Sequence, residues 1–169
     1  MSINFSETKC QTYSDRKLFG LCDDTPPVSN HAYIDEYDGA KWIAVVENEE
    51  RYYVTFTAID NCIVIERSGG IDAKRCDGAL TYNYTIIFVE LKKGDPSKNK
   101  TRWIVEGEEQ LKATIGYFEL EDDAEIYNKK KAYIANSSRP KFNEGQTNRM
   151  EQFFKQTGYV LRIENRIIL

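Results

Sequence analysis

The sequence predicts a single α/β domain in which helices pack against a mixed β-sheet. The chain has 169 residues with 41% hydrophobic and 12% aromatic content, which is enough for one packed core and short for two. Short apolar runs separated by turn residues predict strands before residue 93, and apolar residues at helical spacing predict two helices after it. A helix between strands usually implies parallel pairing, whereas a short turn implies antiparallel pairing, so we expect both kinds in one sheet.

The first 38 residues show the least regular pattern. Thr8–Phe19 could form a short helix, and two adjacent prolines place a loop at 23–30. The one histidine, His31, has no cysteine or second histidine near it in sequence. We therefore interpret it as a surface or packing residue, in preference to a catalytic base.

Three strands are expected next. The runs 42–46 and 51–59 flank a polar turn at Glu47–Glu50, which predicts a hairpin. Cys62–Ile65 follows another turn and predicts a third strand. Together they would make an antiparallel meander.

The central stretch, residues 75–93, contains the residues of greatest chemical interest. Ile86–Val89 is an apolar run typical of a strand buried on both faces. Glu90 and Lys92 follow it and fall on one side, because side chains alternate along a strand. Asp77 precedes Glu90 by thirteen residues, which allows a turn and a return strand. The two carboxylates could then meet and form a metal site.

Helices and strands alternate after this stretch. Thr101 can cap a helix that begins near Arg102 and ends before residue 121. Its apolar face would consist of Ile104, Leu111, Ile115 and Phe118. We further expect a strand at Lys131–Ala135 and a strand or hairpin within Tyr159–Leu169. Between them, a helix is expected at about Thr147–Gln156, ended by Gly158. The inward-facing residues of this helix would be Met150, Phe153 and Phe154.

The net charge of −4 argues against a protein held to nucleic acid by a uniformly positive surface. Positive charge is nevertheless concentrated in two segments, 92–102 and 129–155. Either could contact a phosphate backbone or be an ordinary solvated surface. The acidic segment 35–50 holds six acids against one lysine, Lys41, and is a candidate surface for a basic protein partner.

The four cysteines, Cys10, Cys22, Cys62 and Cys76, contain no C-x-x-C pair, so we expect free and mostly buried thiols in preference to a zinc site. The N-terminal sequence is too polar for a signal peptide, and no segment is apolar enough to span a membrane. These observations predict a cytoplasmic protein without a membrane partner.

Residues 62–135 resemble the PD-(D/E)xK nuclease superfamily, which has a restriction-endonuclease-like core. The resemblance lies in Asp77, in Glu90-x-Lys92 at the end of an apolar strand, and in a following helix that carries Gln110. It implies a central mixed β-sheet flanked by helices. It also implies hydrolysis of phosphodiester bonds, in DNA before RNA, with Mg²⁺ or Mn²⁺ as cofactor. Many members of this family dimerise, which leaves a homodimer open.

The resemblance assigns roles to individual residues. Asp77 and Glu90, with the backbone carbonyl of Leu91, would hold the metal ion. Lys92 would orient or help to deprotonate the attacking water, and Gln110 would point toward the site. The basic residues expected to contact nucleic acid are Lys93, Lys98, Lys100, Arg102, Lys129, Lys130, Arg139 and Lys141.

The chain departs from the family pattern in two places. Cys76 stands before Asp77, where the family name gives proline. Members often add an acid from an upstream helix, and Glu47 or Glu66 are the only candidates that we identify for it. The alternative function is a non-catalytic domain on a similar scaffold that binds a protein or nucleic acid.

Overall fold

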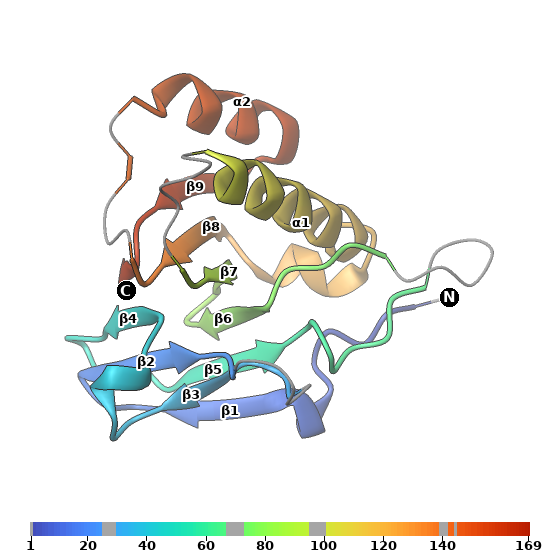
Figure 1. Ribbon diagram of the computed structural model, residues 1–169. Helices are drawn as coiled ribbons and strands as arrows, with labels where there is room; N and C mark the ends of the chain where they lie inside the picture. The colour runs from blue at the N-terminus through green and yellow to red at the C-terminus, as the bar shows by residue number, and fades with distance from the viewer. Residues whose placement is uncertain (1, 25–29, 67–72, 95–100, 139–141, 144) are drawn as a thin grey trace.

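The computed structural model describes residues 2–24, 30–66, 73–94, 101–138, 142–143 and 145–169. Within them the chain forms two mixed β-sheets and two α-helices (Figure 1). In spatial order the larger sheet consists of β1 (Gln11–Ser14), β5 (Val54–Ala58), β6 (Gly78–Tyr82), β7 (Thr85–Lys92), β8 (Lys129–Asn136) and β9 (Val160–Ile163). The smaller sheet consists of β10 (Arg166–Ile168), β4 (Ala44–Glu47), β2 (Leu18–Cys22) and β3 (Tyr33–Asp35). The helices are α1 (Arg102–Phe118) and α2 (Thr147–Thr157), and the short 3-10 turns are η1 (Thr8–Cys10), η2 (Gly39–Lys41) and η4 (Asp122–Ile126).

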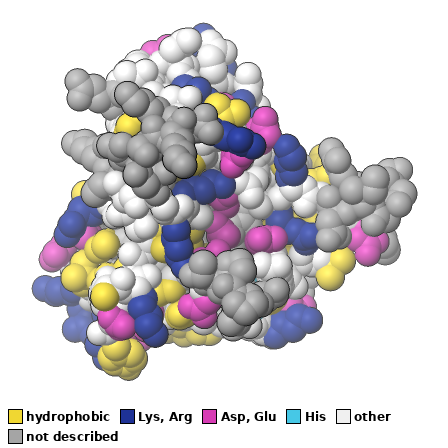
Figure 2. All heavy atoms as spheres, viewed as in Figure 1, with side chains coloured by type: hydrophobic (Ala, Val, Ile, Leu, Met, Phe, Trp, Pro, Cys, Tyr) yellow, Lys and Arg dark blue, Asp and Glu magenta, His cyan; other side chains and the backbone are white. Residues whose placement is uncertain are grey.

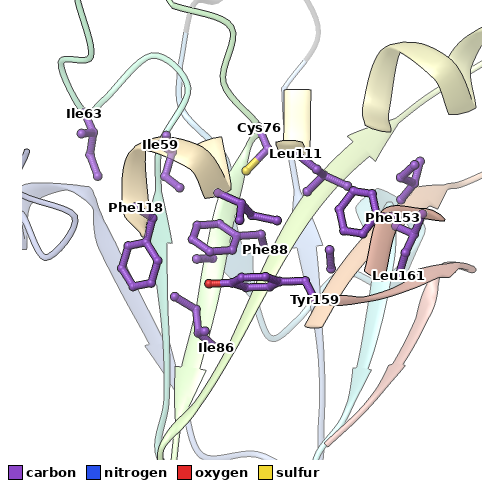
Figure 3. Packing of buried hydrophobic residues seen from close by; sticks show 14 of the residues in the cluster. Ile59, Ile63, Cys76, Ile86, Phe88, Leu111, Phe118, Phe153, Tyr159 and Leu161 are labelled. Atoms are coloured by element: carbon purple, nitrogen blue, oxygen red, sulfur yellow. The ribbon is translucent and has the colours of Figure 1, made fainter. Parts of the chain in front are cut away.

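The elements form three layers, with the larger sheet in the middle. Figure 1 shows α1 and α2 on one face of this sheet and the smaller sheet on the other. Two apolar clusters fill the spaces between the layers. On the helix side, Phe88 of β7 packs with its ring centroid 5.3 Å from Phe118 and 5.8 Å from Tyr159 (Figure 3). The mixed sheet with packed helices is therefore as predicted, and the second sheet is an addition.

Strand β7 contributes side chains to both clusters. Ile86 and Phe88 lie in the cluster beneath the helices, whereas Ile87, Val89 and Leu91 lie in the cluster between the sheets. This is the two-residue alternation of a strand that is buried on both faces, as predicted. Its consequence is that the next even-numbered residues, 90 and 92, continue the row that faces the helices.

A two-residue turn sets the register between β6 and β7. Asn83 and Tyr84 both have positive φ, 40° and 58°, as in the type I′ turns that suit the twist of a hairpin. Tyr82 consequently pairs with Thr85, and Gly78 pairs with Val89. The residue before Gly78 is Asp77, so this antiparallel register brings Asp77 level with the end of β7.

The helices follow the predicted crossovers. α1 connects β7 to β8 and α2 connects β8 to β9, and both strand pairs are parallel. Gly158 ends α2 in the left-handed conformation with φ of 78°, as expected of a C-terminal glycine. Two details differ from the prediction: the Thr101 side chain makes no capping hydrogen bond, and Phe154 is exposed while Phe153 is fully buried.

Before residue 66, the predicted strands 42–46 and 51–59 form as β4 and β5, but the helix, the hairpin and the third strand predicted for this part of the chain are wrong. The segment expected to be a helix, Thr8–Phe19, contains η1, β1 and the start of β2. The expected hairpin does not form, because β4 belongs to the smaller sheet and β5 to the larger one. Cys62–Ile65 is a turn and an extended segment, and β5 instead pairs with β6. In each case distant segments, which sequence periodicity does not reveal, provide the pairing partners.

The prediction of four free thiols is wrong for two of them. Cys10 and Cys62 form a disulfide that ties the start of β1 to the turn after β5, whereas Cys22 and Cys76 are free and buried. Disulfides persist mainly in oxidising compartments, so this bond weighs against the cytoplasmic location, which stays a prediction. Neither α1 nor α2 has the length and hydropathy needed to cross a membrane, and the same is true throughout the described residues.

Substitution of Gly78 is expected to destabilise the sheet. A Cβ at this position would lie 2.3 Å from the ring of Phe56 and 2.7 Å from the Thr57 carbonyl oxygen, so β5 and β6 would have to separate. Gly78→Ala should lower the free energy of unfolding by about 1–3 kcal/mol. Gly116→Ala is the matched control, because Gly116 lies exposed on α1 with nothing near its Cβ position. Urea unfolding should show this second variant to be stabilised by about 1 kcal/mol, and equal effects of the two would contradict the packing argument.

Candidate active site

Asp77 and Glu90 lie side by side at one end of the larger sheet. The register of β6 and β7 places Asp77 next to the last residues of β7. The Leu91 N–H donates a hydrogen bond of 2.6 Å to Asp77 Oδ2, and a further hydrogen bond joins the Asp77 and Glu90 carboxyl groups. The two carboxylates that the sequence placed together are therefore in contact.

Both carboxyl groups are removed from solvent, with exposed fractions of 8% for Asp77 and 2% for Glu90. Burial raises the pKa of Asp77 well above its usual value, and the negative charge of Glu90 raises it further. Burial also raises the pKa of Glu90, although the hydrogen bond from Asp77 and the charge of Lys92 oppose this. Two close acids of this kind titrate as a pair, and the last proton to leave the pair is held more tightly than by either acid alone.

Lys92 and Gln110 complete the arrangement. Lys92 Nζ lies 3.1 Å from Glu90 Oε2 and 3.0 Å from Gln110 Oε1. Gln110 comes from the middle of α1 and also donates a bond of 3.5 Å to the Arg75 carbonyl oxygen. The structure thus brings together Asp77, Glu90, Lys92 and Gln110, all four of the predicted catalytic residues.

The backbone of Leu91 faces the same site. Lys92, the next residue, has its carbonyl turned to the β8 side, where it accepts a bond of 3.1 Å from the Ser137 N–H. In a strand, the N–H and C=O of one residue point to the same neighbour and successive residues alternate. Since the Leu91 N–H is bonded to Asp77, the Leu91 carbonyl also faces the Asp77 side.

This donor set suits a hard divalent cation. Two carboxyl groups and one backbone carbonyl are oxygen ligands, which Mg²⁺ and Mn²⁺ prefer, and Mg²⁺ usually keeps several waters. Among the residues that the structure describes, no three Asp, Glu, His or Cys side chains are grouped closely enough to hold a metal ion. A metal bound here would therefore depend on the carbonyl and on water for its remaining ligands.

Two further acids lie near the pair and were not predicted. Asp60 follows β5, its N–H donates 3.2 Å to the Cys76 carbonyl, and its charge raises the pKa of both Asp77 and Glu90. Asp23 follows β2 in the smaller sheet, and burial together with the charge of Asp77 raises its pKa to about 6. In the sequence both residues are ordinary turn acids. Only the pairing of distant strands places them here.

The upstream acids proposed from sequence lie elsewhere. Glu47 is in β4 of the smaller sheet and pairs with Arg166, and Glu66 is exposed beyond the turn that follows β5. Asp60, which is bonded through its backbone to the residue before Asp77, has the more favourable position for an additional acid.

The basic residues predicted to bind nucleic acid divide into three groups. Lys93 adjoins the site and donates to the Asp23 carbonyl, and Arg102 begins α1 and pairs with Glu106. Lys129 and Lys130 pair with Thr85 and Ile86 at the start of β7. Lys129 and Lys130 are therefore separated from Lys92 by about 20 Å along the direction of β7. The remaining four, Lys98, Lys100, Arg139 and Lys141, lie outside the described residues.

Ion pairs and hydrogen bonds offset much of the negative charge of the acidic segment 35–50. Glu36 pairs with Arg16, Glu47 with Arg166 and Glu49 with Lys17. Asp35 accepts hydrogen bonds from the Trp42 indole and from two backbone N–H groups. A basic partner would have to compete with these contacts, and this surface stays a prediction.

No family model, curated protein or solved structure matches this chain. The resemblance to the PD-(D/E)xK nucleases accordingly depends on the residues themselves and on the contacts just described. In Figure 2, Asp and Glu side chains lie in the middle of the visible face with Lys and Arg side chains beside them.

Replacing Asp77 by asparagine is expected to stabilise the metal-free protein at high pH. Asparagine can still accept from the Leu91 N–H and donate to Glu90, and it cannot ionise. Because the folded-state pKa of Asp77 is raised, the wild type loses stability as the pH rises from about 4 through that raised pKa. In EDTA at pH 8, Asp77→Asn should unfold at a higher urea concentration than the wild type. Its free energy of unfolding should be greater by about 0.5–2 kcal/mol.

The difference should shrink toward pH 4, where the wild-type carboxyl is protonated. Asp122→Asn, on the exposed surface of η4, is the matched control and should change stability by less than about 0.5 kcal/mol. A destabilised Asp77→Asn at pH 8 would show that the Asp77 carboxylate is not under electrostatic strain.

Proposed function

We propose that this protein is a metal-dependent nuclease that hydrolyses phosphodiester bonds, with DNA preferred to RNA as substrate. The observation that carries the proposal is the direct contact of Lys92 with Glu90 and Gln110, beside the hydrogen-bonded pair of Asp77 and Glu90. These residues come from two strands and a helix that are separated in sequence. Their convergence is what the resemblance to the PD-(D/E)xK family requires.

The charge balance around the site supports a need for metal. The charge of Asp60 raises the pKa of Asp23, Asp77 and Glu90, and the charge of Asp77 also raises that of Asp23. The cations near these four carboxyl groups are Lys92, Lys93 and Arg75. A phosphodiester is itself anionic, so it is repelled from carboxylates unless a cation offsets them. A divalent ion held by Asp77, Glu90 and the Leu91 carbonyl would supply that charge and would acidify a bound water.

The chain's own residues position the remaining chemistry. An ammonium has three N–H donors, and among the described residues Lys92 uses two of them on Glu90 and Gln110. The third can hydrogen-bond the attacking water or a phosphoryl oxygen. Because two partners restrain the ammonium and its side chain is only 19% exposed, little side-chain entropy would be lost when Lys92 contacts the reacting group.

The second candidate function is a non-catalytic binding domain on the same scaffold. It is favoured by one observation, the near-complete burial of both carboxyl groups, since a satisfied polar network of this kind can also be purely structural. The two functions differ in whether the site binds a divalent cation. Calorimetric titration with Mn²⁺ distinguishes them.

Cleavage assays test the nuclease directly. With Mg²⁺ or Mn²⁺, the wild type should cut plasmid or single-stranded DNA, and Glu90→Ala and Lys92→Ala should each reduce the rate by about 10²–10⁴-fold. Glu125→Ala and Lys155→Ala, which alter exposed charges in η4 and α2, are matched controls and should keep the wild-type rate. Equal rates in all five proteins, or no cleavage of any substrate by the wild type, would remove the proposal.

Metal affinity should increase with pH. The raised pKa values of Asp77 and Glu90 mean that a proton must leave the pair before the cation binds. At pH values below the pKa at which the pair loses this proton, the dissociation constant for Mn²⁺ should fall by about tenfold for each unit by which the pH is raised. Titrations in two buffers with different ionisation enthalpies should show about one proton released per ion. Metal binding that does not vary with pH and releases no proton would place the metal away from this pair.

A further inference from the structure

Thr114 lies one helical turn after Gln110 on α1 and is fully buried. Its hydroxyl accepts a hydrogen bond of 2.8 Å from the Cys76 N–H and donates one of 3.0 Å to the Gln110 carbonyl. A hydroxyl has one donor, and here the helix carbonyl takes it. One of the two lone pairs on the hydroxyl oxygen is therefore directed at the backbone N–H of Cys76, the residue immediately before Asp77.

The segment that precedes Asp77 is held from two sides. On the β5 side, the Cys76 carbonyl accepts from the Asp60 N–H at 3.2 Å, and the Asp77 carbonyl accepts from the Ile59 N–H at 2.8 Å. On the α1 side, the contact is the Thr114 hydroxyl. Cys76 and the α1 residue Leu111 both belong to the buried cluster beneath the helices (Figure 3). Without Thr114 the Cys76 N–H would be a buried donor lacking its partner, which is costly.

The same turn of α1 also reaches the other side of the site. Gln110 accepts from Lys92 at 3.0 Å and contacts the Arg75 carbonyl. Residues 110 and 114 thus connect α1 both to the strand that carries Glu90 and Lys92 and to the segment that leads into Asp77. α1 is therefore attached to both of the segments that carry the carboxyl pair.

We propose that Thr114 is a positioning residue, whose hydroxyl sets the placement of Asp77 relative to Glu90 and so controls the affinity of the site for a divalent cation. This inference rests on the proposed function, because it assigns Thr114 to the same metal site. Thr114 touches neither the cation nor the substrate. It acts through the backbone of Cys76.

The test compares three variants by Mn²⁺ calorimetry, with urea unfolding to follow stability. Thr114→Val keeps the shape and removes the hydroxyl. It should weaken Mn²⁺ binding by about 10–100-fold, the range typical when a group that supports a metal ligand is lost. Thr114→Ser restores the hydroxyl and should bind within about threefold of the wild type. Thr85→Val is the matched control, because Thr85 is equally buried but lies at the opposite end of β7, and its affinity should be unchanged.

The outcomes separate this inference from the proposed function. A wild type that binds no Mn²⁺ overturns the proposed function itself. A wild type that binds, together with a folded Thr114→Val that binds equally well, overturns only the role of Thr114. Equal weakening in the valine and serine variants also overturns it, since the hydroxyl would then not be responsible. If the valine variant does not fold, Thr114→Cys, which has only a weak donor and acceptor, takes its place with the same expectation.

Discussion

The antiparallel register of β6 and β7 is the constraint on which the rest of the site depends. It is set by the turn at Asn83 and Tyr84 and ends in the hydrogen bond between the Leu91 N–H and Asp77. A shift of one residue would turn Glu90 toward the smaller sheet, because side chains alternate between the two faces. The acid would then be buried among apolar residues, away from α1 and Gln110. The pairing of β6 with β7 therefore also assembles the site, because this pairing keeps the two carboxyl groups together in a buried position.

The sequence was informative where a single short pattern determines both structure and site. The apolar run before Glu90 predicts a buried strand, the two-residue alternation places Lys92 beside Glu90, and helical spacing puts Gln110 in a helix that returns over that strand. These features are local, or separated by one turn or one crossover. The contacts of Asp77, Glu90, Lys92 and Gln110 agree with them. The nuclease activity itself stays a proposal.

The sequence was uninformative where partners are far apart. The smaller sheet combines segments near residues 20, 34, 45 and 167, and no periodicity indicates that they pair. Asp23 and Asp60 approach the site only through such pairings, and the bond between Cys10 and Cys62 joins residues 52 apart. The sequence also does not reveal how the two basic segments lie relative to the site. Lys93, in the first basic segment, follows the end of β7, whereas Lys129, in the second, pairs with Thr85 at the start of that strand.

The pairing of β10 with β4 has a consequence for how the chain acquires its fold. Glu47 of β4 and Arg166 of β10 are 119 residues apart in the chain, and β10 is an edge strand of the smaller sheet. During synthesis β4 therefore emerges from the ribosome long before its parallel neighbour, and its unpaired edge stays open to other chains in the meantime. Because such non-local pairings also slow folding, assembly of the smaller sheet should be the late step, and the stage at which the protein is most prone to aggregate.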